Sequence, residues 1–431
     1  MIKVWDASSG FPKWIEREKP LSKSAQLEEE VRAIIEEVKA RGDAALLEFT
    51  RKFDGASLTN ENLKVNAEEI KEAYEKVSKE QVSAIKKIKQ RLEIVEKFTL
   101  KQAETEIDMG EIYVKFRLRP IESVGCYVPG GKASYPSTLV MTVVPAKLAG
   151  VPRVLVCTPP NADGTVNPLT LVAADICRAD EIYRVGGAQA IAAMAYGTET
   201  IKPVKKVVGP GNKYVTMAKI LVSRDVSIDM PAGPSELLVI ADETADPRFI
   251  ALDMCSQAEH GPDSIVGLVT TSREIAEKVL SELEKIAYSS PRSNIIADVL
   301  SNNGFVIVGK TVDDMVNIAN AFAPEHVEVI TKNSEQVAEK LYTAGLILIG
   351  PYSPASLSDY YSGTNHVLPT GGFGRTFSGL SSLDFVRRVA IVSCSKEGLL
   401  KVLKHIKVLA EAENLQNHYR AVRGRFKVEG S

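Results

Sequence analysis

The stretch that decides the fold of this chain is VPRVLVCTPPNADGTVNPLTLVAADICRADEIYRVGGAQAIAAMAYGT, residues 151–198. Its short apolar run VPRVLVC is typical of a buried strand, and NPLTLVAADICRAD is typical of a helix. The same order then repeats, with EIYRVGGAQ as strand and turn and AIAAMAYGT as helix. Strands that alternate with helices in this way predict a parallel sheet with crossover helices.

The alternation continues on both sides of this stretch. KKVVGPGN and YVTMAKILVS add a further strand, turn and helix, and a second series begins at ELLVIA, residues 236–241. Residues 24–107 are rich in Glu and Lys at helical spacing, with Asn66 and Glu69 placed as a capping box. We therefore predict an α/β fold with two incomplete, Rossmann-like parallel-sheet domains, a small N-terminal arm over residues 1–23 and a helical C-terminal tail.

Composition excludes several classes of protein. The 431 residues include 53 basic and 55 acidic side chains, closely mixed, so no nucleic-acid partner is expected. The richest apolar stretch, STLVMTVVPAKLAGVPRVLVC, is broken by prolines and basic residues, and the charged N-terminus lacks the apolar core of a signal peptide. We expect no membrane segment. The five cysteines form no CxxC pair, which favours buried thiols in a reducing cytoplasm.

The segment CSQAEHGPDS, residues 255–264, contains two side chains that can bind a metal ion. Asp246 and Pro247 start a helix before it, and Gly261 follows as a stop signal. Gln257 and His260 are three residues apart, so they share one face near the C-terminus of that helix. By itself this spacing is a weak signal, and a capping histidine beside a polar surface explains it better.

A second candidate site is the Pro-Glu-His step in FAPEHVEVI, where Glu325 and His326 open an apolar strand. An imidazole and a carboxylate in one cleft suit acid–base chemistry on two successive steps. The alternative is an exposed edge charge beside a hydrogen-bonded core histidine. Of the other histidines, His366 lies in a Gly-rich loop with Asp359, and His405 has the setting of an ordinary helix residue.

Three glycine turns each follow an apolar, strand-like run: YVPGGKASYPS (127–137), VGGAQAIAA (185–193) and VVGPGNKYV (207–215). Turns between a parallel strand and a helix suit the binding of phosphate or a dinucleotide. None of them has the GxGxxG spacing, so tight crossover turns explain them equally well. Asp225 and Asp229 follow the third turn as possible ribose-binding acids.

Taken together, SQAEHGPDS, GCYVPGG, DMPAGPSE, APEH and DYYSGTNHVLPT resemble the histidinol dehydrogenase family in order, spacing and wording over nearly the whole chain. The resemblance implies a catalytic acid–base pair of Glu325 and His326. It implies dinucleotide contacts from one residue of each glycine turn, namely Tyr127, Gln189 and Asn212. It implies four zinc ligands: Gln257, His260, Asp359 and His418. Substrate contacts are implied at Ser235, Gln257, His260, His326, Asp359, Glu413 and His418. His366 lies inside the motif loop and is expected to be a supporting or a substrate-side residue.

The family's activity is the NAD-dependent, four-electron oxidation of L-histidinol to L-histidine through L-histidinaldehyde, the last steps of histidine biosynthesis. One Zn²⁺ per subunit, NAD and a homodimer with shared active sites are implied with it. The implied domains are a catalytic α/β domain from residues 24–126 and 235–380, a dinucleotide-binding domain over 127–234, and a tail over 381–431 that is exchanged in the dimer.

Two other classes of function are compatible with the same residues. A zinc hydrolase would use Glu325 to activate a metal-bound water, but it leaves the three glycine turns without a purpose. A non-enzymatic sensor would use the two sheets to bind a dinucleotide or an amino acid. NAD binding separates the hydrolase from the dehydrogenase, and substrate-dependent formation of NADH separates the sensor from it.

Overall fold

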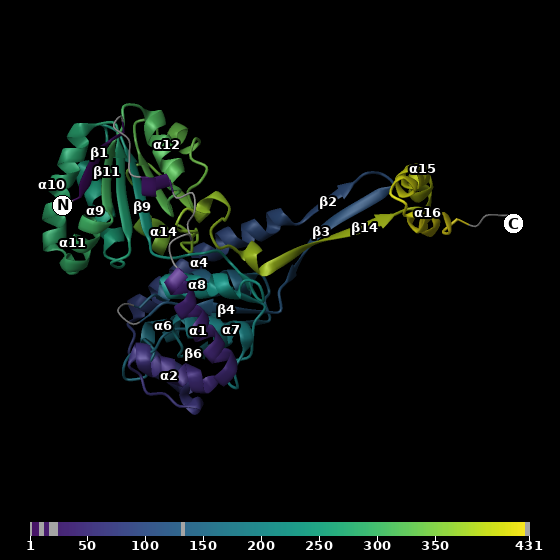
Figure 1. Ribbon diagram of the computed structural model, residues 1–431, viewed down its shortest axis with the longest axis horizontal. Helices are drawn as coiled ribbons and strands as arrows, with labels where there is room; N and C mark the ends of the chain where they lie inside the picture. Colours follow the sequence, from purple (N-terminus) through teal and green to yellow (C-terminus); the bar gives the residue numbers. More distant parts are fainter. Residues whose placement is uncertain (1, 8–12, 17–24, 131–133, 427–431) are drawn as a thin grey trace. The chain divides into compact units, whose positions relative to one another are not determined.

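A computed structural model describes residues 2–7, 13–16, 25–130 and 134–426 of the chain (Figure 1). It divides into two compact units, which we describe separately. Unit 1 comprises residues 1–96 and 121–385, and unit 2 comprises residues 97–120 and 386–431. The predicted α/β class with two parallel sheets is confirmed, and both sheets belong to unit 1.

The Glu- and Lys-rich segment forms helices, as its spacing predicts. They are α1 (Ala25–Arg41), α2 (Asp43–Asp54), α3 (Ala67–Glu75) and α4 (Lys79–Ala103). At the start of α3, the Asn66 side chain accepts a hydrogen bond from the main chain of Glu69, and the Glu69 side chain accepts one in return. This capping box satisfies two N–H groups that have no partner within the helix.

The opening stretch, residues 151–198, supplies two strands of a five-stranded parallel sheet with the order β6-β5-β4-β7-β8. Its strands are β4 (Ser123–Tyr127), β5 (Arg153–Cys157), β6 (Glu181–Tyr183), β7 (Lys206–Val208) and β8 (Ser227–Ile228). The helices that connect them are α5 (Pro136–Leu148), α6 (Pro168–Cys177), α7 (Gly187–Tyr196) and α8 (Lys213–Val222). Each strand–helix pair read from residues 151–223 is therefore confirmed.

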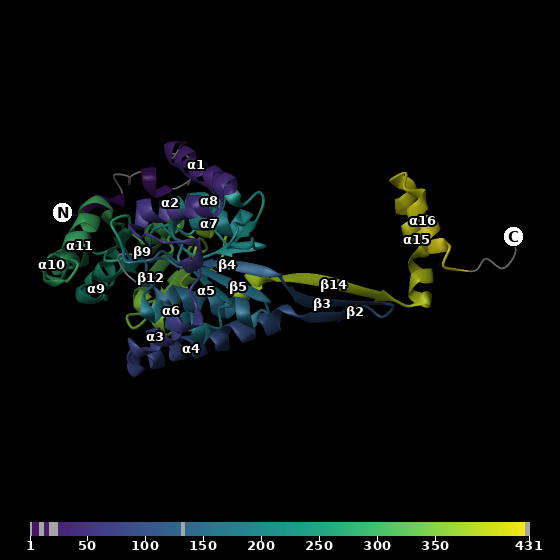
Figure 2. The same ribbon diagram turned by 90° about the horizontal axis from the view of Figure 1, so that it is seen from below.

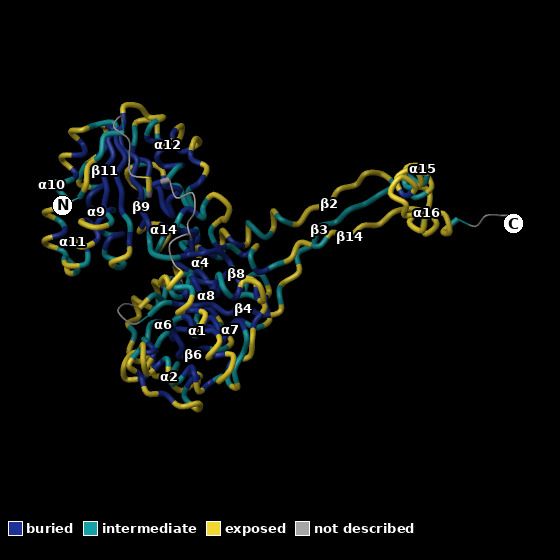
Figure 3. The backbone as a smooth tube through the Cα atoms, viewed as in Figure 1, coloured by how far each residue is buried: buried dark blue, intermediate teal, exposed yellow. Residues whose placement is uncertain are grey.

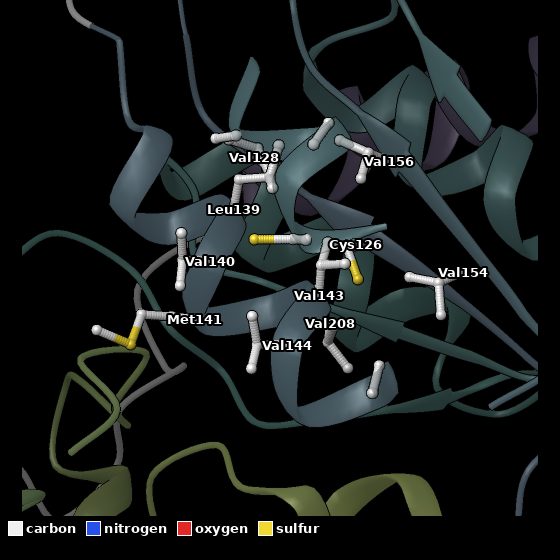
Figure 4. Close-up of a cluster of buried hydrophobic side chains, with 14 of the residues drawn as sticks. Cys126, Val128, Leu139, Val140, Met141, Val143, Val144, Val154, Val156 and Val208 are labelled. Carbon is white, nitrogen blue, oxygen red and sulfur yellow. The ribbon is translucent and has the colours of Figure 1, made fainter. Parts of the chain in front are cut away.

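Helices cover both faces of this sheet, which is why its strands are mainly apolar after their first residue. One face packs against α3, α4, α5 and α6, and the other packs against α1, α2, α7 and α8 (Figure 2). Figure 4 shows the first core, where Cys126 of β4 and Val154 and Val156 of β5 lie among side chains of α5. Cys126, Cys157, Cys177 and Cys255 are buried free thiols, as predicted, whereas Cys394 is exposed.

The second parallel sheet has six strands in the order β1-β11-β10-β9-β12-β13. They are β1 (Lys3–Asp6), β9 (Glu236–Ala241), β10 (Ile265–Thr270), β11 (Gly304–Val308), β12 (His326–Ile330) and β13 (Leu346–Ile349). Its helices are α9 (Pro247–Ala258), α10 (Arg273–Ser289), α11 (Ser293–Asn302), α12 (Val312–Phe322), α13 (Ser334–Ala338) and α14 (Ala355–Tyr360). The central strands of this sheet are buried along their length (Figure 3).

The predicted N-terminal arm contains a strand that its sequence pattern did not indicate. Lys3–Asp6 forms β1, which pairs in parallel with β11 at the edge of the six-stranded sheet. Ile15 follows in a short 3-10 helix, η2 (Lys13–Glu16), and is fully buried in the core beside α12. Residues 8–12 and 17–23 of the predicted arm lie outside the described residues.

Unit 2 is an antiparallel sheet followed by two helices. Its strands are β2 (Thr105–Asp108), β3 (Ile112–Pro120) and β14 (Val386–Cys394), in the order β14-β3-β2. The predicted helical tail is confirmed as α15 (Lys396–Ala412) and α16 (Gln416–Arg423). The strand β14 between residue 385 and these helices was not predicted. No helix in the described part of the chain is long and apolar enough to cross a membrane.

Candidate active site

The residues from the three glycine turns lie at the carboxyl ends of strands in the five-stranded sheet. Tyr127 is the last residue of β4, Gln189 lies in the first turn of α7 after β6, and Asn212 is the N-cap residue of α8 after β7. Crevices at this edge of a parallel sheet are where ligands commonly bind, beside the free N–H groups of the following helices.

Tyr127 and Gln189 are buried at this edge, with 4% and 1% of their surface exposed. The main-chain N–H of Gly187 donates a hydrogen bond of 3.1 Å to the Tyr127 hydroxyl oxygen. The Gln189 amide nitrogen Nε2 is buried and has no hydrogen-bond partner among the described residues. Since a buried polar atom without a partner is costly, this nitrogen is a candidate for contact with a bound ligand.

The third turn requires glycine because it touches the neighbouring strand. Gly209 has φ of +117°, and a Cβ atom there would lie 2.2 Å from the carbonyl oxygen of Tyr127. The Asn212 side chain then accepts hydrogen bonds from the main chain of Tyr214 at 3.0 Å and of Val215 at 3.1 Å. Asn212 is therefore a helix cap whose Oδ1 is already engaged.

A buried ion pair holds the main chain of this turn through hydrogen bonds. Lys219 and Asp229 form it, and neither side chain has any exposed surface. Lys219 Nζ donates to the Gly209 carbonyl at 2.8 Å, and Asp229 Oδ2 accepts from the Gly209 N–H at 2.8 Å. Burial lowers the pKa of Lys219, and the charge of Asp229 opposes that effect. The prediction that Asp229 contacts a ribose is wrong, because its carboxylate is enclosed by this pair.

The second group of candidate residues lies at the amino ends of strands in the six-stranded sheet. Ser235 directly precedes β9, and Glu325 and His326 stand at the start of β12. His260 follows α9 just before β10, and Asp359 lies near the end of α14. The helices α9 and α14 pack against each other, so these side chains come from adjoining elements.

Glu325 and His326 form a buried acid–base pair. His326 Nδ1 lies 3.6 Å from Glu325 Oε2, and 2% of His326 and 7% of Glu325 is exposed. The predicted alternative of an exposed edge charge is therefore wrong. Neither ring nitrogen of His326 has a hydrogen-bond partner in the described part of the chain. Two unpartnered nitrogens on a buried ring indicate a group that awaits a ligand or water.

The charges of the pair shift both pKa values. Burial lowers the pKa of His326, but the charge of Glu325, its interaction with the ring and the charge of Asp359 together raise the pKa to about 9. Burial raises the pKa of Glu325, the Glu236 carboxylate adds to the rise, and the charge of His326 opposes it. Shifts of this kind in buried neighbouring groups are typical of catalytic sites.

The two candidate metal ligands from CSQAEHGPDS lie in the last turn of α9 and just beyond it. Gln257 is 2% exposed and lies in the last turn of the helix, which ends at Ala258. His260 follows in a turn, with Nδ1 3.3 Å from the carbonyl oxygen of Gln257. The predicted helix start is also confirmed, because Asp246 caps α9 through the main chain of Arg248.

His366 holds the segment that carries Asp359. Its Nδ1 lies 3.2 Å from the Asp359 carbonyl oxygen and 3.7 Å from Asp359 Oδ1. Its Nε2 lies 3.4 Å from the hydroxyl of Thr138 in α5. Burial lowers the pKa of His366, with the charge of Asp359 opposing that shift. His366 thus contacts the segment of Asp359, and its supporting or substrate-side role stays a prediction.

Two further residues carry chemistry that the spacing analysis missed. Glu236, the first residue of β9, exchanges hydrogen bonds with Glu325. Glu328 in β12 accepts a hydrogen bond of 2.7 Å from the main chain of Ala355 at the start of α14. Burial and the charge of Asp253 raise the pKa of Glu328 well above its ordinary value. Glu236 stands within the motif DMPAGPSE, so its position beside Ser235 was the available signal.

The remaining predicted residues belong to unit 2. Glu413 is the C-cap residue of α15 and His418 lies in α16, and both are exposed. Within the ranges that the structure describes, no group of three or more His, Cys, Asp or Glu side chains is arranged to hold a metal ion. Gln257, His260 and Asp359 belong to unit 1 and His418 to unit 2, so the four-ligand set stays a prediction.

Comparison with known proteins identifies the family. A family model described as histidinol dehydrogenase matches residues 17–426. A histidinol dehydrogenase of Methanothermobacter thermautotrophicus is 46% identical over 395 residues, which cover 91% of this chain and 92% of the relative. One from Archaeoglobus fulgidus is 45% identical over 404 residues, covering 93% and 95%. The crystal structure of histidinol dehydrogenase from Elizabethkingia anophelis has a TM-score of 0.90 at 39% identity, covering 99% of this chain and 97% of that chain.

Proposed function

Because the chain belongs to the histidinol dehydrogenase family of histidine biosynthesis, we propose that it oxidises L-histidinol to L-histidine in two NAD-dependent steps through L-histidinaldehyde. The observation that carries the proposal is the buried pair of Glu325 and His326, with Nδ1 3.6 Å from Oε2. A base of this kind is what both oxidations require, since each must remove a hydroxyl proton.

His326 is proposed to serve as the base in both oxidations. Its ring nitrogens have no partner among the described residues, so one of them is free to accept the proton of the substrate hydroxyl. The Glu325 carboxylate stabilises the imidazolium that forms, as its effect on the pKa of His326 indicates. In the second oxidation Glu325 takes a proton from the water that attacks the aldehyde, and His326 then deprotonates the hydrate.

The glycine-turn residues are proposed to bind NAD. Gln189 offers the unpartnered Nε2 as a donor, Tyr127 lies beside it at the N-terminus of α7, and Asn212 lies at the N-terminus of α8. Bound NAD⁺ supplies the hydride acceptor for both steps. The partial positive charge of the two helix N-termini suits its pyrophosphate.

One Zn²⁺ per subunit is proposed from the chemistry of the available donors. Gln257, His260 and Asp359 provide an amide oxygen, an imidazole and a carboxylate on adjoining elements, and this donor set suits zinc. His418 of a second copy is proposed as the fourth ligand. Bound zinc supplies a template that anchors the imidazole and amino groups of the substrate and leaves its carbinol free to react.

A homodimer with shared active sites is proposed as the working assembly. The fourth zinc ligand, His418, and the substrate contact Glu413 are both exposed in the tail, where a second copy could use them. Ser235 and Glu413 are proposed as further substrate contacts, together with the zinc ligands and His326. The enzyme is proposed to work in the cytoplasm, because none of its cysteines forms a disulfide. The catalytic and dinucleotide-binding domain boundaries predicted above are part of the same proposal.

The experiment that tests the proposal counts the NADH formed per L-histidinol consumed by the purified protein with zinc, and again with a chelator. We expect two NADH per L-histidinol, loss of activity on chelation and recovery on addition of zinc. One NADH with release of the aldehyde would remove the step assigned to Glu325. The absence of NADH with zinc present would contradict the proposal and favour the zinc hydrolase or the sensor.

A further inference from the structure

Glu236 stands directly opposite Glu325 in the six-stranded sheet. The strands β9 and β12 are parallel neighbours in which His326 pairs with Leu237, so the residue before each of these occupies the same level. Only 3% of Glu236 and 7% of Glu325 is exposed. Burial of two neighbouring carboxyl groups raises the free energy of the folded protein unless hydrogen bonds within the protein replace those to water.

Reciprocal hydrogen bonds provide this replacement. The main-chain N–H of Glu236 donates to Glu325 Oε2 at 2.8 Å, and the main-chain N–H of Glu325 donates to Glu236 Oε2 at 3.3 Å. The other oxygen of Glu236, Oε1, accepts from the N–H of Gly371 at 2.9 Å. The main chain of Glu236 therefore holds the Glu325 side chain, and the Glu236 carboxylate holds the Glu325 main chain and joins it to the loop that follows His366.

This arrangement orients one oxygen of the Glu325 carboxylate. Oε2 accepts a hydrogen bond from the main-chain N–H of Glu236 and lies 3.6 Å from Nδ1 of His326. Burial raises the pKa of Glu325, His326 and the main-chain N–H of Glu236 lower it, and the charge of the Glu236 carboxylate adds a smaller rise. A raised pKa makes Glu325 a better acceptor for the proton of water.

We propose that Glu236 is a positioning residue that holds Glu325 for the attack of water on the aldehyde. The proposal rests on the function proposed above and adds to it a residue specific to the second oxidation. Glu236 acts through Glu325, so its loss should slow aldehyde oxidation more than alcohol oxidation.

The test uses Glu236→Gln with L-histidinol and L-histidinaldehyde as separate substrates. The amide must present its NH₂ group to one of the two N–H donors, from Glu325 or Gly371, so one hydrogen bond is lost. We expect kcat for the aldehyde to fall about 10- to 100-fold and kcat for the alcohol to change by less than about 3-fold. The acid limb of the aldehyde pH profile should move to lower pH, because a negative neighbour of Glu325 is removed.

Asp242→Asn is a matched control at the other end of the same strand pair. Asp242 follows β9, is 9% exposed, and accepts hydrogen bonds from Lys332 at 2.7 Å and Thr244 at 3.0 Å, both through main-chain N–H groups. This variant disturbs the same two strands away from Glu325. It should lower the thermal stability without changing the ratio of the two activities or the pH profile.

A double variant tests whether Glu236 acts through Glu325. In a Glu325→Gln background, Glu236→Gln should cause little further loss of aldehyde oxidation, because the group that it positions is absent. If the two substitutions instead lowered aldehyde oxidation by independent factors that multiply in the double variant, the proposal would be overturned. Equal losses on both substrates in Glu236→Gln, or an unchanged pH profile, would also overturn it. If the unaltered protein forms no NADH, the proposed function itself fails, which is a different result.

Discussion

The two parallel sheets of unit 1 carry their candidate residues at opposite strand ends. In the five-stranded sheet, Tyr127, Gln189 and Asn212 follow the carboxyl ends of strands and lie at helix N-termini. In the six-stranded sheet, Glu325 and His326 stand at the amino end of β12, and His260 lies just beyond the C-terminus of α9.

Helix dipoles explain this difference. A helix N-terminus offers free N–H groups and partial positive charge, which suit a phosphate. A helix C-terminus offers carbonyl groups and partial negative charge, which suit a metal ion or a cationic imidazole. The proposed dinucleotide site thus lies beside helix N-termini, whose partial positive charge favours phosphate. The proposed metal site lies beside a helix C-terminus, whose partial negative charge favours a cation. The comparison also shows that the carboxyl-end rule locates only one of the two candidate regions.

The largest effect is expected at the amino-end region, from His326→Asn. Removal of the only base proposed for both steps should lower kcat for L-histidinol and for L-histidinaldehyde, each by about 10²- to 10⁴-fold. Steady-state assays with each substrate measure the loss. His405→Asn, at an exposed position of α15, is the control and should leave both rates unchanged. Normal alcohol oxidation by His326→Asn would remove this residue from the mechanism.

The matching change in the carboxyl-end region is Lys219→Met. It leaves the Asp229 carboxylate buried without its partner, which should lower the free energy of unfolding by about 3–5 kcal/mol. Because Lys219 and Asp229 both bind Gly209, the KM for NAD should rise more than the KM for L-histidinol. Denaturant titration and initial rates check both effects. The Lys219→Met, Asp229→Asn double variant should regain stability, and further loss would argue against the buried pair.

A smaller and unequal effect is expected from Glu325→Gln. Oxidation of the aldehyde should fall about 10- to 100-fold, with a smaller loss of alcohol oxidation. The rate of alcohol oxidation should rise with pH as the imidazolium of His326 loses its proton, since its pKa is raised to about 9. Removal of the Glu325 charge should move that rise to lower pH. Equal losses on the two substrates would count against water activation by Glu325. An unchanged pH profile of alcohol oxidation would count against its effect on the pKa of His326.

The smallest effect is expected from Asn212→Ala, which removes the cap of α8 in the carboxyl-end region. Loss of the bonds to Tyr214 and Val215 should cost about 0.5–2 kcal/mol of stability. If Asn212 also contacts NAD, the KM for NAD should rise without a change in kcat. The same substitution at Asn66, the cap of α3, is the control for stability alone. Equal KM values in the two variants would mean that Asn212 is only a cap.

Much of the fold was predictable because the signals are local. The alternation in residues 151–223, the caps at Asn66 and Asp246 and the burial of four thiols follow from neighbours along the chain. The strands that were missed lack such signals. β1 is an edge strand whose partner β11 lies some three hundred residues later, and β14 pairs with β3 across a similar separation. Periodicity within a short window cannot reveal pairing over these distances.

For the candidate residues, too, local sequence could identify some features and not others. The sequence by itself determined which side chains can act, because the motifs around His260, His326 and Asp359 contain the necessary imidazole and carboxylate groups. Only the tertiary structure decided how they are held. The bonds between Glu236 and Glu325 join residues 89 positions apart, and Asp229 proved to be an enclosed partner of Lys219. The physical reason is that parallel strands bring distant residues to one level, and burial then makes their hydrogen bonds and charges decisive.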